Sequence, residues 1–183
     1  MEKPFSQSFR VYDGLLFAGC YPGDLDPAER DHKLRGLLDC GILRVINLME
    51  ADETSGGRAF NPYAPRLQAL AADCGMTVEC LRLPIKDASA PTPSVMRQIL
   101  DTLDEGMARQ MPTYLHCWGG HGRTSTVVGC HLIRHGRTAT QAIEQIGRWR
   151  AALPKHPDPF ENGQKAFVES WSEHDPAILK GQQ

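Results

Sequence analysis

The sequence Tyr114-Leu-His-Cys-Trp-Gly-Gly-His-Gly-Arg-Thr-Ser125 organises the rest of the chain. It runs from an apolar segment to Cys117, then through five residues that include three glycines, and reaches Arg123, where a helical pattern with several hydroxyl side chains begins. Glycine tolerates positive φ and has no Cβ, so the backbone N–H groups of such a loop can converge on one point, to which a helix N-terminus adds positive potential. This order of residues predicts an anion-binding loop with a nucleophile at its base.

Cys117 and Arg123 give this loop its chemistry. Converging N–H dipoles, a helix N-terminus and a guanidinium all favour the thiolate form of Cys117, which is the nucleophilic form of cysteine. Arg123 offers a planar fork that can bind two phosphate oxygens at once, which the point charge of lysine does less well. A phosphate-sized dianion is therefore the expected ligand.

The motif His116-Cys117-x5-Arg123-Thr124 resembles the signature of the cysteine-dependent protein tyrosine phosphatase superfamily, in particular its small dual-specificity branch. The resemblance is strongest over residues 80–136 and weaker across 10–172. It implies a phosphatase that uses Cys117 as its nucleophile. A nucleotide-binding Walker loop fits less well, because that motif requires lysine at position 123 and glycine at position 117.

The composition sets the outer bounds. With 183 residues the chain is long enough for one domain, and we expect a single phosphatase-like catalytic domain over 1–183, with its core at about 10–172 and a loose C-terminal tail. A net charge of −2 without blocks of like charge points to neither nucleic acid nor a membrane as partner. Because residues 1–20 lack a signal-type apolar run and no segment is long enough to span a bilayer, we expect a cytoplasmic protein. We also expect a monomer.

The cysteines, at positions 20, 40, 74, 80, 117 and 130, are scattered without paired C-x-x-C spacing. This pattern favours neither a disulfide scaffold nor a structural zinc site. His116, Cys117 and His121 crowd one loop without a recognisable fourth ligand, so we expect no metal and no cofactor. Apart from Cys117, we expect the cysteines to be small buried hydrophobic residues. The open alternative is that one of them lies near Cys117 and forms a reversible disulfide with it.

Segments typical of strands alternate along the chain with segments typical of helices. The expected strands are a hairpin over 9–18 and single runs at 43–48, 76–83 and 111–116. The expected helices begin at 26–27, 61–62, 92–93, 123, 138 and about 160, and a capping residue followed by proline recurs at 26–27, 61–62, 92–93 and 158–159. This alternation predicts an α/β fold, a three-layer domain with a central, largely parallel sheet flanked by helices. The resemblance implies the same architecture.

A phosphoester leaves as an alkoxide or phenoxide, so the reaction needs a general acid. Asp87 is the candidate, because it lies in a loop after a predicted strand and Pro84-Ile-Lys-Asp87 resembles the acid-bearing loop of the dual-specificity branch. The alternative is a solvated loop carboxylate. Asp101 and Asp104 are weaker rivals, since helical spacing places them on the outer face of their helix. The polar segment 49–60 is expected to be a solvated loop, or else to border the site.

Other residues are expected to support the reaction. Thr124 is placed to stabilise the thiolate through its hydroxyl, with capping of the helix start as the alternative. His116 is expected to orient the loop rather than act as a base. Gln164 resembles a glutamine that positions the hydrolytic water in related enzymes, and a solvent-facing helix position is the alternative. The residues expected to bind substrate are Trp118, Gly119, Gly120, His121, Gly122 and Arg123.

The predicted function is hydrolysis of phosphotyrosine through a cysteinyl-phosphate intermediate, with phosphoserine and phosphothreonine as open further substrates. An inositol phosphate or another small phosphomonoester is the alternative substrate. A catalytically silent phosphate-binding module is the alternative from a different class, but such a module needs neither the thiol of Cys117 nor the carboxyl group of Asp87. The expected partner is thus a phosphorylated protein or a small phosphoester.

Overall fold

The computed structural model describes residues 3–154 and 158–173. Five strands form the main sheet, in the order β1-β2-β7-β3-β6. They are β1 (Ser8–Tyr12), β2 (Leu16–Gly19), β3 (Arg44–Asn47), β6 (Glu79–Arg82) and β7 (Thr113–His116). β2, β7, β3 and β6 are mutually parallel, and β1 pairs with β2 as an antiparallel hairpin at one edge. The predicted largely parallel sheet is confirmed.

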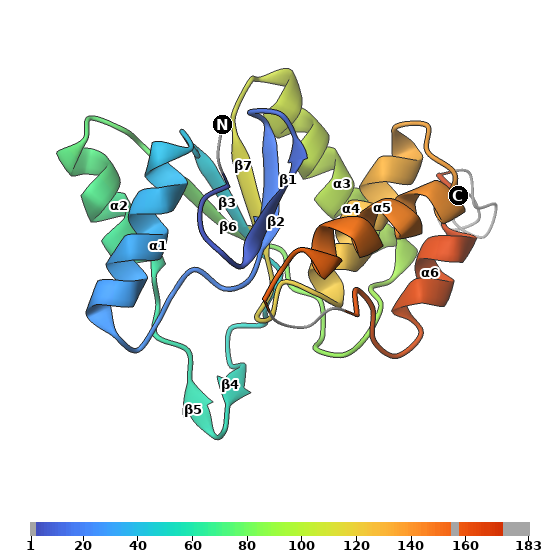
Figure 1. Cartoon of the computed structure of the whole chain (residues 1–183), viewed down its shortest axis with the longest axis horizontal. Coiled ribbons are helices and arrows are strands. Elements are labelled where there is room, and N and C mark those ends of the chain that lie inside the picture. The colour runs from blue at the N-terminus through green and yellow to red at the C-terminus, as the bar shows by residue number, and fades with distance from the viewer. Residues whose placement is uncertain (1–2, 155–157, 174–183) are drawn as a thin grey trace, which may run out of the picture.

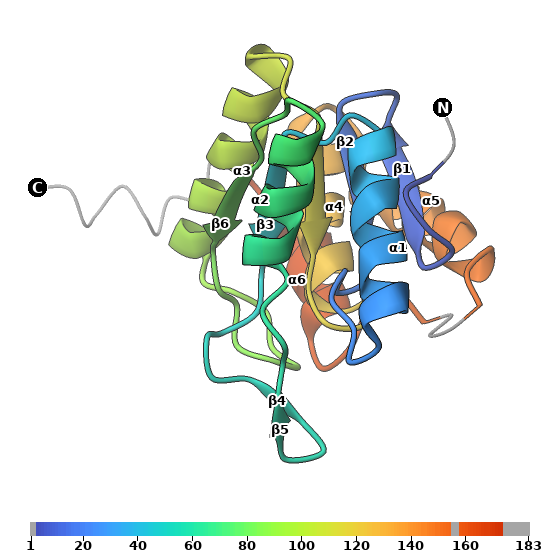
Figure 2. The same ribbon diagram turned by 90° about the vertical axis from the view of Figure 1, so that its left-hand side faces the viewer.

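Helices cover both faces of this sheet, which gives the three layers expected (Figures 1 and 2). In the described residues these helices are α1 (Pro27–Asp39), α2 (Ala64–Asp73), α3 (Pro93–Ala108), α4 (Arg123–Arg134), α5 (Ala139–Ala151) and α6 (Gln164–Ser170). α1 and α2 lie on one face, and α3 to α6 lie on the other. Among the described residues, no helix is both long enough and apolar enough to cross a membrane.

The hydrophobic core is divided by the sheet, because successive side chains of a strand point to opposite faces. Phe17, Val45 and Tyr114 pack in the cluster formed with α1 and α2. Their neighbours along the strands pack in the cluster on the other face, with α3 to α6: Leu16, Ala18, Ile46 and Leu115. Strand β7 is buried at every position, so it forms a fixed base for the loop that follows it.

Two of the predicted helix starts are confirmed in detail. Asp26 accepts a hydrogen bond from the backbone N–H of Ala28 at 2.9 Å and begins α1, with Pro27 in its first turn. Thr92 accepts one from the backbone N–H of Val95 at 3.3 Å and begins α3. In both cases the side chain satisfies a backbone donor that the helix leaves unpaired.

The other two proline-based starts are wrong. α2 begins at Ala64 rather than at 61–62, because the carbonyl of Asn61 accepts a hydrogen bond from the Tyr21 hydroxyl, which holds this segment outside the helix. α6 begins at Gln164 rather than at 158–160 and ends at Ser170. The carbonyl of Pro159 accepts a hydrogen bond from the backbone N–H of Gly122 at 2.9 Å, so this segment is bound to the loop after β7. The expected loose tail at 174–183 lies outside the described residues.

The segment 49–60 is not a plain loop. It carries a short hairpin of β4 (Thr54–Ser55) and β5 (Arg58–Ala59), which projects beyond the carboxyl edge of the sheet (Figures 1 and 2). In the sheet, Asn47 of β3 is in register with His116 of β7 and with Arg82 of β6. The loops that follow these three strands therefore leave from the same edge.

Candidate active site

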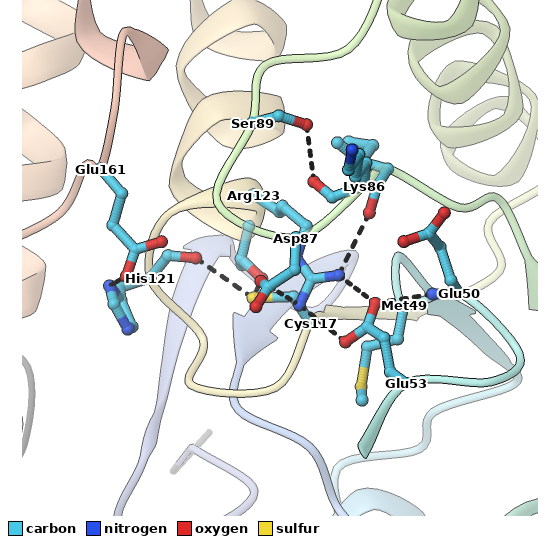
Figure 3. Close-up of polar contacts among 12 residues, drawn as sticks. Met49, Glu50, Glu53, Lys86, Asp87, Ser89, Cys117, His121, Arg123 and Glu161 are labelled. Carbon is cyan, nitrogen blue, oxygen red and sulfur yellow. Dashed lines mark hydrogen bonds and ion pairs between the residues drawn. The ribbon is translucent and has the colours of Figure 1, made fainter. Parts of the chain in front are cut away.

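Cys117 follows the last residue of β7, and Arg123 is the first residue of α4. The five residues between them form a loop at the carboxyl edge of the sheet, where functional sites of open α/β sheets are found. The loop after β3 and the loop after β6 meet it there (Figure 3). Three segments far apart in the sequence thus build one site.

Cys117 lies at the base of this loop, and the residue is only 3% exposed. The hydroxyl of Thr124 donates a hydrogen bond to Sγ at 3.0 Å, the contact expected for a residue that stabilises a thiolate. The thiol in turn donates to the backbone carbonyl of His121 at 3.1 Å. A group that accepts from Thr124 and is held beneath a glycine loop has the position of a nucleophile.

The glycines of the loop act in different ways. Gly120 and Gly122 adopt positive φ, at 69° and 53°, whereas Gly119 does not. A Cβ on Gly120 would lie 2.3 Å from the backbone carbon of Gly19, so only glycine lets the loop pack directly against the end of β2. The expected convergence of backbone N–H groups fails at the peptide between His121 and Gly122. There the carbonyl of His121 faces the sulfur, and the N–H of Gly122 donates to the carbonyl of Pro159.

Arg123 is 3% exposed and holds two carboxylates. Its Nη1 and Nη2 donate to the two oxygens of Glu53, the second at 3.1 Å, and Nη1 also donates to the backbone carbonyl of Ile85 at 3.1 Å. Asp87 Oδ1 lies 2.8 Å from Nη2. Burial lowers the pKa of Arg123, but the hydrogen bonds to Glu53 and the nearby negative groups outweigh it, so the pKa lies above its ordinary value.

The candidate acid, Asp87, lies at the site, with 61% of its side chain exposed. Its rivals do not: Asp101 and Asp104 pair with Arg134 on α4. The expectation that Asp104 faces outward is wrong, because its Oδ1 accepts hydrogen bonds from His131 and His135 across the α3–α4 interface. Helical spacing alone did not show that α4 covers this side of α3.

His116 is fully buried beneath the loop. Its Nδ1 lies 2.9 Å from the carbonyl of Cys117, which can only accept, so Nδ1 carries the proton. Nε2 therefore accepts the hydrogen bond from the Tyr63 hydroxyl at 2.7 Å. Burial lowers the pKa of His116 to about 3, which keeps the imidazole neutral. These contacts fit the predicted orienting role.

Gln164 is fully buried, so the alternative of a solvent-facing helix residue is wrong. Its Nε2 donates to the carbonyl of Ser89 at 3.0 Å, and its Oε1 accepts from the backbone N–H of Glu161 at 2.8 Å. The amide lies against Gly122, where a Cβ would be 3.2 Å from Oε1. Gln164 thus joins the loop that carries Asp87 to the loop that carries Cys117.

Two residues that the sequence did not single out also contact the site. Glu53 comes from the segment expected to be a solvated loop or to border the site, and the second possibility is the correct one. Arg150 of α5 is fully buried and donates from Nη1 to the carbonyl of Gly120 at 2.9 Å. It follows Ile146 by four residues, so the helical period already placed it on the inward face of α5.

Trp118 stands at the rim of the loop with 48% of its surface exposed. Its ring packs edge to face against Phe60 at 6.1 Å, and both rings border a groove of about 360 Å³. Leu25 on the same groove is 69% exposed, and Lys33 and Arg58 also line it. Asp24, which also lines the groove, pairs with Lys33 at 2.7 Å, so the surface beside Trp118 is partly apolar with charged groups of both signs at its edge.

A family model described as "Tc-R-P: Polymorphic toxin system, DSP-PTPase phosphatase" matches residues 22–137, which include Cys117, Arg123 and Asp87. The chain belongs to this family. It is thus a member of the cysteine-dependent, dual-specificity-like protein tyrosine phosphatase superfamily, as the motif implied.

Similar proteins agree with this membership. The chain is 39% identical over 61 residues to phosphatidylglycerophosphate phosphatase PTPMT2 of Arabidopsis thaliana, which is 33% of this chain and 25% of that protein. It is 29% identical over 112 residues to human cyclin-dependent kinase inhibitor 3, covering 60% and 50% of the two chains. It therefore spans half or less of these curated relatives.

Two solved structures show the same fold. The crystal structure of PTPMT1 in complex with PI(5)P superimposes with a TM-score of 0.65 at 22% identity, covering 89% of this chain and 92% of that one. The core catalytic domain of the PP-IP phosphatase SIW14 from S. cerevisiae, in complex with citrate, gives a TM-score of 0.66 at 13% identity, covering 96% and 91%. The predicted α/β architecture is confirmed by this likeness.

Proposed function

We propose that this protein hydrolyses phosphate monoesters through a cysteinyl-phosphate intermediate. The observation that carries the proposal is that the loop from Cys117 to Arg123 meets a carboxyl group, that of Asp87, from a separate loop. Thr124 Oγ1 lies 3.0 Å from the sulfur of Cys117, and Asp87 lies 2.8 Å from Arg123. A silent phosphate-binding module has no use for the thiol or for the exposed carboxyl group.

In the first step, the thiolate of Cys117 attacks phosphorus, an S–P bond forms and the ester P–O bond breaks. Asp87, in its acid form, gives its proton to the departing oxygen. In the second step, water attacks the same phosphorus and Asp87 takes a proton from it. The S–P bond then breaks, and the Thr124 hydroxyl stabilises the thiolate that leaves.

Arg123 has two edges for two different tasks. Glu53 occupies the edge formed by Nη1 and Nη2, which fixes the plane of the guanidinium. The edge formed by Nε and Nη2 is assigned to the phosphoryl group, and the Asp87 carboxylate, 2.8 Å from Nη2, then moves to the leaving oxygen. Bidentate binding of this kind stabilises the charge that spreads over the phosphoryl oxygens.

Binding of a dianion also requires a change in the loop. The carbonyl of His121 faces the sulfur, and its oxygen would repel a phosphoryl group there. Rotation of the peptide between His121 and Gly122 would turn the Gly122 N–H inward and release its bond to Pro159. Glycine at 122, with φ 53° and ψ −107°, allows such a rotation at low cost.

Phosphotyrosine is the substrate we favour, with phosphoserine and phosphothreonine as further substrates. The exposed ring of Trp118, next to Cys117 and beside Phe60, offers apolar surface to the aromatic part of the ester. An inositol phosphate or another small phosphoester is the second candidate, because the structures of similar fold include PTPMT1 in complex with PI(5)P and the PP-IP phosphatase SIW14. The monomeric state and the cytoplasmic location remain predictions.

A substrate panel tests the proposal. The purified chain is assayed against phosphopeptides, inositol phosphates and an aryl phosphate, alongside Cys117→Ser. We expect turnover of at least one class by the native chain and none by Cys117→Ser, which should still bind vanadate because Arg123 and the loop remain. Hydrolysis by Cys117→Ser near the native rate would reject a cysteinyl intermediate, and no turnover of any substrate would favour the silent binding module.

A further inference from the structure

A second cluster of reactive side chains lies between α3 and α4, away from the catalytic loop. Asp104 of α3 faces His131 of α4 and His135, which caps the end of that helix. His131 follows Arg123 by eight positions along the helix, a distance of about 12 Å along the axis. None of these three residues contributes to the site at Cys117 described above.

The geometry of the cluster is that of a set of metal ligands. Nε2 of His131 and Nε2 of His135 lie 2.9 and 2.8 Å from the same oxygen of Asp104, and the three ligand atoms lie within 4.8 Å of one another. The two histidines are four residues apart, so they project from one face of the helix end. Two imidazoles and one carboxylate therefore converge on one point.

The surroundings hold this arrangement in place. The second oxygen of Asp104 accepts a hydrogen bond from Arg134 at 3.0 Å, and Arg134 is itself paired with Asp101 and Glu173, so its charge is balanced. The Tyr12 ring of β1 packs edge to face on His131, at 5.7 Å between centroids. Its contact with His135 is similar, at 6.3 Å. Arg134 thus holds Oδ2 of Asp104, which leaves Oδ1 directed at the two imidazoles.

Among the described residues, hydrogen bonds satisfy only one ring nitrogen of His131. The ring is fully buried, and in the described part of the chain its Nδ1 has no hydrogen-bond partner. Because a carboxylate only accepts, Nε2 of each histidine carries the proton toward Asp104 in this arrangement. Two N–H groups compete for a single oxygen, an arrangement that a cation between them would replace.

We propose that Asp104, His131 and His135 bind a divalent transition-metal ion, with Zn²⁺ as the most suitable. Neutral imidazole suits Zn²⁺ and its neighbours in the first transition row, whereas Ca²⁺ and Mg²⁺ require oxygen ligands. Metal binding requires the other tautomer of each histidine: the proton moves from Nε2 to Nδ1, and the Nε2 lone pair then binds the metal. Since 40% of the His135 side chain is exposed, water completes a tetrahedral site.

A small adjustment opens the triangle of ligands. Bond lengths near 2.0–2.1 Å in a tetrahedral zinc site place ligand atoms about 3.4 Å apart, roughly 0.5 Å more than the hydrogen-bond distances here. His135 follows the last residue of α4 and is partly exposed, so it is the ligand that can move. The bound ion would then tie α3 to α4, the helix whose first turn carries Arg123 and Thr124.

The test measures metal binding rather than turnover, so it is independent of the proposed function. The full chain carrying Cys117→Ser, which removes the reactive thiol as a competing ligand, is titrated with Zn²⁺ by calorimetry and with Co²⁺ by visible absorption. His135→Ala is compared with the control His32→Ala, which removes an exposed histidine on α1. His135 is chosen because its partial exposure lets the variant fold.

We expect one equivalent of Zn²⁺ to bind to the control, and at least about 100-fold weaker binding to His135→Ala and to Asp104→Asn. At one hundred times Kd, Zn²⁺ should raise the Tm of the control by about 5 to 10 °C and leave His135→Ala unchanged. Equal binding by His135→Ala and the control would overturn the proposal. So would no binding to the control, or a thiolate-to-cobalt charge-transfer band, which would place the ion at a cysteine.

Discussion

Arg123 lies between two carboxylates from two different loops, and these carboxylates differ in exposure and in how many contacts they make with Arg123. Glu53 is 12% exposed, holds Arg123 with both oxygens, and also accepts a hydrogen bond from the backbone N–H of Glu50 at 2.7 Å. Asp87 is 61% exposed and reaches Nη2 with one oxygen at 2.8 Å. A buried bidentate carboxylate fixes the arginine, whereas an exposed single contact can be released to meet a substrate.

In the Glu53 loop the carboxylate itself is bonded to its own loop, whereas the Asp87 loop is fixed through backbone carbonyls. The Glu53 loop closes on itself through Glu50 and is attached to the sheet by Arg82, which donates to the carbonyl of Met49 at 2.7 Å. The Asp87 loop is held on either side of the acid. The Ile85 carbonyl accepts a hydrogen bond from Arg123 at 3.1 Å, and the Ser89 carbonyl accepts one from Gln164 at 3.0 Å. From this difference we expect Glu53 to position Arg123 and Asp87 to act on the substrate. Three experiments test this distinction, in order of decreasing expected effect, and a fourth measures the stability of the fold in acid.

Replacing Arg123 removes both its paired contact with Glu53 and its proposed paired contact with the phosphoryl group. Arg123→Lys retains the charge but loses the planar fork, so it can neither bind a phosphoryl group with two bonds nor hold Glu53 with both oxygens. We expect kcat/KM to fall by about 10³–10⁵-fold. Steady-state kinetics with an aryl phosphate measure this, and circular dichroism checks the fold. Activity near that of the native chain would show that Arg123 serves the structure alone.

Removing the carboxylate of Asp87 should lower the rate of hydrolysis by an amount that depends on the leaving group of the substrate. Asp87→Ala should slow hydrolysis of tyrosyl or alkyl phosphates by about 10²–10⁴-fold, the usual range for a general acid. Aryl phosphates with acidic phenols leave with little help and should be much less affected. The high-pH limb of the rate profile, set by loss of the acid's proton, should flatten.

Asp52→Ala is the matched control, because Asp52 is a carboxylate of the other loop. It should leave both the rate and its dependence on the leaving group unchanged. If Asp87→Ala instead slows all esters equally and keeps a bell-shaped profile, Asp87 is not the acid, and the carboxylates of 49–60 become the candidates.

Removing the positioning carboxylate gives a loss that does not depend on the substrate. Glu53→Gln keeps the shape of the side chain but weakens its hold on Arg123, and we expect a decrease of roughly 10- to 100-fold in kcat/KM from misplacement of the guanidinium. The decrease should be the same for aryl and alkyl esters. Glu50→Gln, which changes a neighbouring carboxylate of the same loop, is the control. A dependence on the leaving group in Glu53→Gln would remove the distinction between the two carboxylates.

The smallest expected effect is a loss of folding stability at acid pH, caused by buried His116. This loss has to be measured separately, because activity also changes with pH when catalytic groups titrate. The pKa of buried His116 is about 3 in the folded chain, against an ordinary value of 6.5, so the unfolded chain binds more protons below pH 6.5. The contribution of neutral His116 to the free energy of unfolding is therefore fully present above pH 6.5. It decreases as the pH falls, by about 1 kcal/mol per pH unit between pH 6 and 4.5.

Urea unfolding at several pH values measures this slope. Burial also lowers the pKa of His131, to about 4, so that residue adds to the same slope. His116→Gln should reduce the dependence on pH whatever its stability at pH 7, and His32→Gln should not. An unchanged slope in His116→Gln would mean that His116 is not the buried neutral imidazole.

Much of the catalytic loop was predictable because its determinants are local. Cys117, the glycines and Arg123 lie within seven residues, and the spacing of these residue types by itself indicates an anion loop at a helix start. The same holds for the helix starts at Asp26 and Thr92, where a side chain bonds to a backbone N–H two or three residues away. Interactions of such short range leave their pattern in the sequence.

The tertiary structure alone decided which distant residues complete the site. Glu53 is 70 residues from Arg123, and the two meet because β3 and β7 are adjacent and parallel, a register that no local pattern encodes. Contacts of this kind also overruled local signals, since Tyr21 and the catalytic loop hold the segments at 61–62 and 158–159 outside their helices. The sequence by itself determined the loop from Cys117 to Arg123, because contacts within a few residues specify it. The order of the strands determined the partners, because packing of the whole chain is what brings distant loops together.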